Sequence, residues 1–149
     1  MAKVHFAVTR DLLLPAAAVF GELIDWKGHA NWVPLTRVRI LTGDGGPGTE
    51  FVATSGIGPF ALPDRMRVDE LDPVAMTVTI TKIGPVLTGS VHLSVAPTGS
   101  ASSRLVWVED IRVPVLPQFL ARPAAAASRR GFEMSITRLA KLLAAGPGS

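Results

Sequence analysis

The sequence contains no cysteine and no tyrosine, and only 6% of its 149 residues are aromatic. The absence of cysteine excludes disulfide bonds, thiolate metal sites and a thiol nucleophile, and it fits a reducing compartment. Charged residues make up only 18% of the chain and hydrophobic residues 48%, a balance that argues against disorder. A chain of this length can bury a sizeable core. We therefore expect a single folded domain spanning residues 1–149.

Basic residues are few and dispersed along the chain. Lys and Arg number 15 against 12 Asp and Glu, and Arg129 and Arg130 form the only adjacent basic pair. Nucleic-acid binding requires a dense basic surface with interleaved aromatic residues, so we expect no nucleic-acid partner. The three histidines are His5, His29 and His92, and their scattered positions lack metal-ligand spacing. We therefore expect no metal and no cofactor.

The apolar run Leu12–Phe20 is the only N-terminal segment that resembles a targeting or membrane sequence. It is interrupted by Pro15 and is too short to cross a bilayer. The preceding segment Val4–Thr9 alternates apolar and polar residues, which indicates a strand rather than the start of a signal peptide. We therefore expect no transmembrane segment and a cytoplasmic location. The sequence leaves the oligomeric state open.

The periodicity of apolar residues predicts the order of elements. After the first strand, Ala16–Asp25 has helical spacing, and Trp26–Trp32 continues as a second short helix or helical turn. From there the period is two, with short turns rich in glycine and proline. We expect six further strands, at residues 36–42, 50–54, 65–71, 76–82, 88–96 and 104–113.

The last part of the chain predicts one long amphipathic helix, at about residues 124–145. Phe132, Ile136, Leu139 and Leu143 form its apolar stripe, and the opposite side is mostly charged. Pro114, Pro117 and Pro123 should prevent regular structure before this helix begins. Sequential strands joined by short turns pair antiparallel, so one such helix against the sheet makes a two-layer α+β domain.

That order, with the residues that punctuate it, resembles the START-like (SRPBCC) superfamily, specifically its polyketide cyclase/dehydrase branch. The resemblance covers nearly the whole chain. The residues that carry it are Asp25-Trp26, Trp32-Val33-Pro34, the glycine-rich turn 43–48 before Phe51, Asp64-Arg65-Met66, Asp72-Pro73, Gly84 to Gly89, Leu105-Val106-Trp107 and Arg129-Arg130-Gly131-Phe132-Glu133.

The resemblance implies a helix-grip fold, in which a curved antiparallel sheet of seven strands grips the C-terminal helix and leaves a cavity between them. Members of the superfamily bind lipids, sterols, polyketides, quinones or plant hormones. Some catalyse cyclisation or aromatisation, and others only carry a ligand. The family has no shared catalytic motif that can be transferred position by position.

Glu109 is the residue in the sequence best suited to chemistry. In the strand 104–113 it shares the face of Leu105 and Trp107, which points its carboxylate inward toward the helix. A carboxyl group removed from water suits a general acid or base, or a hydrogen-bond anchor for a ligand. The alternative is a Glu near the cavity mouth that is wet or paired with an Arg.

Three other polar residues have two interpretations each. Glu70 falls on the face of Met66, but beside a turn that should expose it to water. Arg129 lies about 60° from the centre of the helix stripe, where it would reach Glu109 or an anionic ligand group, or extend to solvent. His29, between two tryptophans, would line a cavity entrance or belong to a packed corner.

The inward faces define the expected cavity wall, unless these side chains simply pack as core. The residues are Phe51, Met66, Val68, Val78, Trp107, Phe132 and Ile136, with Phe119 covering one end. This lining is nearly all apolar, so the expected partner is an apolar small molecule with few polar groups.

Three functions therefore remain open after the sequence alone. The first is binding of a lipid, polyketide or quinone in the cavity. The second is a cyclase or aromatase with Glu109 as proton shuttle. The third is an interaction module that uses four outer-face arginines, Arg37, Arg39, Arg65 and Arg67.

Overall fold

The computed structural model describes residues 2–146, apart from the side chain of Phe60. Its strands are β1 (Ala2–Leu12), β2 (Thr36–Thr42), β3 (Glu50–Ser55), β4 (Leu62–Asp72), β5 (Thr77–Ile83), β6 (Thr88–Gly99) and β7 (Ser102–Val113). Its helices are α1 (Ala16–Leu23) and α2 (Ala121–Ala145), with short 3₁₀ helices η1 (Lys27–Asn31), η2 (Gly58–Phe60) and η3 (Gln118–Leu120).

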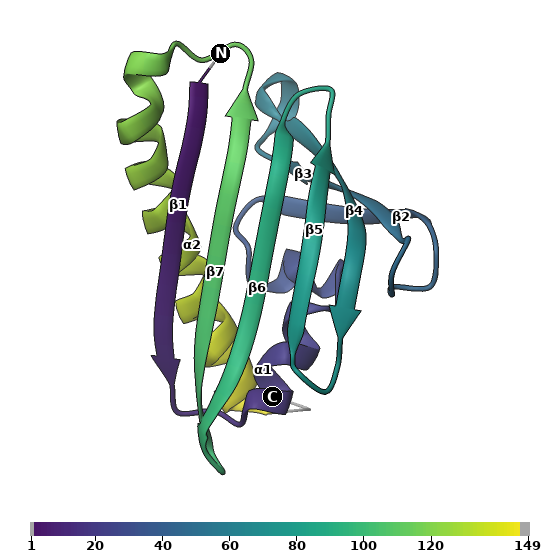
Figure 1. Ribbon diagram of the computed structural model, residues 1–149, viewed down its shortest axis with the longest axis vertical. Helices are drawn as coiled ribbons and strands as arrows, with labels where there is room; N and C mark the ends of the chain where they lie inside the picture. Colours follow the sequence, from purple (N-terminus) through teal and green to yellow (C-terminus); the bar gives the residue numbers. More distant parts are fainter. Residues whose placement is uncertain (1, 147–149) are drawn as a thin grey trace.

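The seven strands form a single antiparallel sheet in the order β1-β7-β6-β5-β4-β3-β2. The first strand, β1, pairs with the last strand, β7. All other strands that are adjacent in the sheet are also consecutive in the sequence. Helix α2 lies across one face of this sheet (Figure 1). The predicted α+β fold, a seven-stranded sheet with a long C-terminal helix, is therefore confirmed.

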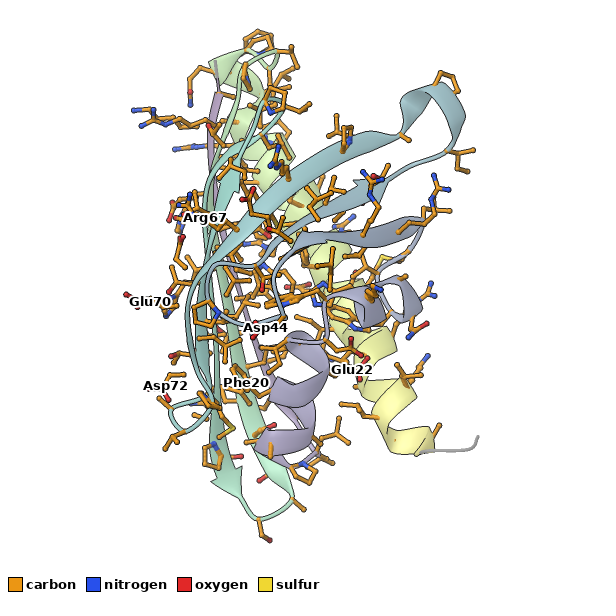
Figure 2. The ribbon with its side chains drawn as sticks, turned by 90° about the vertical axis from the view of Figure 1, so that its right-hand side faces the viewer. Phe20, Glu22, Asp44, Arg67, Glu70 and Asp72 are labelled. Carbon is orange, nitrogen blue, oxygen red and sulfur yellow. The ribbon has the colours of Figure 1, made fainter. Side chains whose placement is uncertain are left out.

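The two faces of the curved sheet differ in polarity because the strand residues alternate. Along β1, for example, Val4, Phe6 and Val8 are buried and the residues between them are exposed. Arg67, Glu70 and Asp72 project from the outer side of the sheet (Figure 2). Helices α1 and α2 both lie on the inner side.

A register shift in β4 corrects one expectation from the alternation. The pairing with β5 is irregular between Val68 and Glu70, which is the position of a β-bulge. Before the shift Val68 is buried, and after it Leu71 is half-buried while Glu70 is exposed. Glu70 therefore leaves the face of Met66 and Val68 and is solvated on the outside.

Helix α2 begins three residues earlier than the proline pattern predicts. Ala121 is its first residue, and Pro123 lies in its first turn. The first four N–H groups of a helix have no partner within it, so a proline there removes no hydrogen bond. The predicted apolar stripe faces the sheet, with Ile136 and Leu139 fully buried. Among residues 2–146, no helix is long and apolar enough to span a bilayer.

Helix α1 fills part of the concave side of the sheet. Val19, Phe20 and Leu23 are buried, and Phe20 projects from α1 toward the sheet whereas Glu22 projects away from it (Figure 2). Side chains of α1 therefore cover part of the inner face of the sheet. Any cavity is confined to the region that α1 leaves uncovered.

The segment η1 is anchored to the glycine-rich turn between β2 and β3. The indole Nε1 of Trp26 donates a hydrogen bond to the carbonyl oxygen of Gly45 at 2.8 Å. Its ring stacks on Phe51 of β3, with centroids 4.9 Å apart. These contacts fix η1 over the sheet and so determine the position of His29.

Candidate functional site

A partly enclosed cavity of about 110 Å³ lies between the inner face of the sheet, η1 and α2. Strands β2 to β7 all contribute to its wall, and α2 contributes Phe132. Most of the wall is apolar, but three charged side chains interrupt it. The lining residues are His29, Val33, Thr36, Phe51, Ala53, Ser55, Asp64, Met66, Ile80, Lys82, Val91, Leu93, Trp107, Glu109 and Phe132.

The charged residues of this wall are Lys82, Asp64 and Glu109, which we call the ion cluster. Each comes from a different strand, β5, β4 and β7. The ammonium Nζ of Lys82 hydrogen-bonds to Oδ2 of Asp64 and lies 3.4 Å from Oε1 of Glu109. The side chains of Lys82 and Glu109 are only 7% and 3% exposed. Two carboxylates and one ammonium therefore meet away from bulk water.

Lys82 keeps its charge in this environment. Burial by itself lowers the pKa of an ammonium group. The negative charges of Glu109 and Asp64, together with the hydrogen bonds to them, more than offset that effect, so the pKa of Lys82 is raised above its ordinary value. A charged lysine is a hydrogen-bond donor and not a nucleophile, so this site does not present a reactive amine.

The two carboxylates differ in how completely they are bonded. Glu109 uses both oxygens: Oε2 accepts from the indole Nε1 of Trp107 at 2.8 Å, and Oε1 faces Lys82. Asp64 uses only Oδ2, and its buried Oδ1 has no hydrogen-bond partner among the described residues. Since Asp64 lines the cavity, its Oδ1 is the one carboxylate oxygen of the wall that has no hydrogen-bond partner.

His29 adds a neutral ring to the wall. Its Nε2 lies 2.6 Å from the carbonyl oxygen of Leu23, which can only accept, so Nε2 carries the proton and Nδ1 does not. Burial lowers the pKa of His29, outweighing the opposite effects of the Leu23 carbonyl and the Asp25 charge. The ring packs against both Trp26 and Trp32. It is thus part of an aromatic corner and also lines the cavity.

A surface groove of about 300 Å³ adjoins the cavity between α2 and the start of β2. The two spaces share four lining residues, Val33, Thr36, Ser55 and Phe132. Phe132 packs against Trp107, with ring centroids 4.4 Å apart, and against Phe6 at 5.5 Å. Its aromatic ring therefore stands between the groove and the interior.

The structure brings together five of the ten residues predicted for the ligand site. Those that line the cavity are Phe51, Met66, Trp107, Glu109 and Phe132. Three others, Val68, Val78 and Ile136, are buried core residues outside the lining. Alternation identifies which face a residue is on, but it does not distinguish a cavity wall from the packed core beneath it.

The remaining two predicted residues, Phe119 and Arg129, lie outside the cavity. Phe119 is 81% exposed and is not part of the cavity wall, so it does not cover one end. Arg129 is exposed and lines a separate surface groove with Arg130 and Glu133. The cation beside Glu109 is Lys82 rather than Arg129.

Sequence reasoning missed Lys82 and Asp64, although the signal was present. Lys82 follows Val78 and Ile80 at the inward period of β5, and Asp64 precedes Met66 and Val68 at the inward period of β4. Residues at strand ends are usually solvated, and the predicted strand 65–71 begins one residue after Asp64, whereas β4 begins at Leu62. In the sheet, Asp64 pairs with Ala53 and Lys82 pairs with Met66. Because Ala53 and Met66 line the cavity, these pairings place Asp64 and Lys82 in its wall as well. The lining is consequently less apolar than expected.

The outer-face arginines are partly neutralised by neighbours. Arg65 lies 2.8 Å from Glu50, and Arg67 lies 2.8 Å from Asp69. The four arginines therefore do not make the uniformly positive patch that the interaction-module hypothesis requires.

Comparisons with known proteins agree with this architecture. Residues 3–144 match the family model described as polyketide cyclase / dehydrase and lipid transport. The chain matches no curated protein sequence. The Zhui aromatase/cyclase from Streptomyces sp. R1128 has a similar structure, with a TM-score of 0.76, 19% identity, and 97% of this chain and 98% of that chain covered.

A START superfamily protein from Mycobacterium smegmatis is also similar, with a TM-score of 0.79 and 16% identity over 93% of this chain and 98% of that chain. At these identities the two structures show a shared fold. The family model covers nearly the whole chain, including all of β2 to β7 and α1, and all but one terminal residue of β1 and of α2. This protein therefore belongs to the polyketide cyclase / dehydrase and lipid transport family.

Proposed function

We propose that this protein binds a small, mostly apolar molecule in the cavity between the sheet and α2. The observation that carries the proposal is an internal space whose apolar wall includes a fixed, buried ion cluster. Buried charges are costly unless they are paired, and a core built only for stability is more simply made of apolar side chains. An apolar wall with a few convergent polar groups is the usual composition of a ligand site.

The volume of the cavity limits the size of the ligand that it can hold. An engineered protein cavity of about 150 Å³ binds benzene, and the present cavity measures about 110 Å³. A whole sterol or acyl chain does not fit such a volume, whereas a single ring is near its limit. The adjoining groove of about 300 Å³ would hold the rest of a longer molecule. We therefore favour a ligand with one ring inside, past Phe132.

The proposal is tested by finding whether a ring compound occupies the interior. Native mass spectrometry of the purified protein, followed by solvent extraction, would identify a co-purifying molecule. In parallel, toluene is titrated into the protein and followed by amide NMR. Shifts should concentrate at cavity residues such as Ala53, Trp107 and Phe132.

A matched pair of variants makes this test specific. Ala53 lines the cavity, so Ala53→Leu fills it and should abolish the toluene shifts. Ala144→Leu makes the same change on an exposed part of α2 and should leave them intact. If neither a co-purifying molecule nor cavity shifts are found in the parent protein, the inward residues pack only as core and the proposal is wrong.

A second candidate function is proton transfer on a bound ligand, as in a cyclase. The observation that favours it is the free Oδ1 of Asp64, held beside a charged lysine. Since both oxygens of Glu109 are bonded, Asp64 suits the base better than Glu109 does. Turnover of a ligand identified by extraction should then be lost in Asp64→Asn while binding persists. Equal rates in variant and parent would eliminate this role.

A further inference from the structure

The ion cluster has hydrogen-bonding capacity that the described protein groups leave unused. Oδ1 of Asp64 is a buried acceptor without a partner. A lysine ammonium has three N–H donors, and among the described residues Lys82 contacts only Asp64 and Glu109. The cavity wall therefore has one unused acceptor, Oδ1 of Asp64, and one unused donor, the third N–H of Lys82. These two residues contact each other. Buried polar groups in native proteins are normally satisfied by protein groups, by ordered water or by a ligand. A ligand group with one donor and one acceptor would satisfy both of these positions.

The chemistry of that partner follows from the charges around it. A ligand carboxylate would be a third negative group around a single ammonium. A ligand ammonium would lie beside the ammonium of Lys82 and would lose its hydration on entering the cavity. A hydroxyl group adds no charge, donates one hydrogen bond and accepts another. Of these three groups, only the hydroxyl matches both unused positions.

We propose that the ligand is a small ring compound bearing a hydroxyl group, that is, a phenol or a cyclic alcohol. This proposal rests on the proposed function. Its O–H donates to Oδ1 of Asp64, and its oxygen accepts from Nζ of Lys82. Hydrogen bonds to charged groups are stronger than those between neutral groups. The ring lies against the apolar wall that includes Phe51 and Trp107.

Glu109 has a different role in this arrangement, as a positioning residue. Its oxygens face Lys82 and the indole of Trp107, so it holds Lys82 in place and does not contact the ligand. The two carboxylates of the cavity therefore have separate roles. Asp64 contacts the ligand, and Glu109 orients the lysine that does.

The experiment compares four one-ring probes by NMR titration at pH 7: phenol, toluene, benzoate and benzylammonium. Phenol and toluene differ only in a hydroxyl in place of a methyl group. Because a hydroxyl is more costly to remove from water, an apolar cavity prefers toluene. We expect the reverse here, with phenol bound about tenfold or more tightly than toluene. Phenol, unlike toluene, should also shift the ¹⁵Nζ resonance of Lys82.

Two variants test the role of Asp64, one at Asp64 itself and one at a carboxylate outside the cavity. Asp64→Asn presents an amide whose oxygen is needed by Lys82, so its NH₂ group faces the ligand and cannot accept from a hydroxyl. The preference for phenol should be lost or reversed. Glu70→Gln, an exposed change on the outer face, should leave the preference unaltered. The Lys82 resonance in the parent protein provides a readout that does not depend on the folding of any variant.

The possible results test the hydroxyl group of the ligand separately from the binding of a ring compound in the cavity. Equal binding of phenol and toluene, or a preference for toluene, would overturn the hydroxyl while leaving a ring-binding cavity. Tightest binding of benzoate or benzylammonium would also overturn it, in favour of a charged ligand. No binding of any probe would overturn the proposed function itself, and the inference with it.

Discussion

Trp107 and Glu109 lie two residues apart on β7, and the indole Nε1 of the first donates to Oε2 of the second at 2.8 Å. Both side chains face the cavity because strand residues two apart share a face. This contact satisfies the one polar atom of a buried aromatic ring, and it leaves Oε1 of Glu109 to face Lys82. Strand β7 thus forms its own hydrogen-bonded pair and directs it toward Lys82 on β5, across the intervening strand β6.

Glu109→Gln should destabilise the protein by about 1–3 kcal/mol. The amide has one acceptor oxygen, whereas the carboxylate accepts from both Trp107 and Lys82, so one of these donors must face an NH₂ group. Urea unfolding monitored by tryptophan fluorescence measures the change. Glu70→Gln is the matched control, because Glu70 is exposed on the outer side of the sheet (Figure 2), and it should change stability by less than about 0.5 kcal/mol. Similar losses in both variants would contradict the buried contact.

Lys82→Met should cost about 3–5 kcal/mol at pH 7, because it leaves the buried Glu109 and the largely buried Asp64 without their cation. Denaturant unfolding at pH 7 measures the loss. Lys141→Met, on the exposed side of α2, is the control and should change the free energy of unfolding by less than about 0.5 kcal/mol. An equal loss in the two variants would argue against the buried ion pair.

The stability of the parent protein should fall at alkaline pH. In the folded state the pKa of Lys82 lies above its ordinary value of 10.5, since Glu109 and Asp64 outweigh the effect of burial. The stabilisation is therefore complete below pH 10.5 and is lost as the pH rises through the folded-state pKa. Chemical denaturation between pH 9 and 12 measures it, and the chain has no tyrosine or cysteine to titrate in this range. Lys82→Met should lack this part of the decline.

His29 should remain neutral, with the proton on Nε2, when the pH falls below the ordinary histidine pKa of 6.5. Its lowered pKa follows from burial, and the Leu23 carbonyl selects the tautomer. Long-range ¹H–¹⁵N NMR distinguishes the two ring nitrogens, with the exposed His5 and His92 as references within the same spectrum. Because the folded-state pKa is lowered, the contribution of His29 to stability is present above pH 6.5 and is lost as the pH falls through that pKa. A His29 ring that takes up a second proton at or above pH 6.5 would contradict the assignment.

Much of the architecture is determined by the sequence alone. The alternation along β1, β5 and β7 identifies their buried faces, and the spacing of Phe132, Ile136 and Leu139 identifies the buried stripe of α2. Glycine and proline locate the turns between them. These signals are local, because each depends on the backbone geometry of one element, and so they can be read without knowledge of the neighbours.

Only the tertiary structure brings the three residues of the ion cluster together. Glu109 could be assigned to the inner face by alternation, but its partner could not, because Lys82 lies 27 positions earlier and Asp64 a further 18. Their meeting depends on the register of four adjacent strands, from β4 to β7. Whether a buried side chain lines a cavity or packs as core, as with Val68 and Val78, likewise depends on which elements pack over that part of the concave face. Periodicity assigns a residue to a face, but only the packing of separate elements determines what that face contacts.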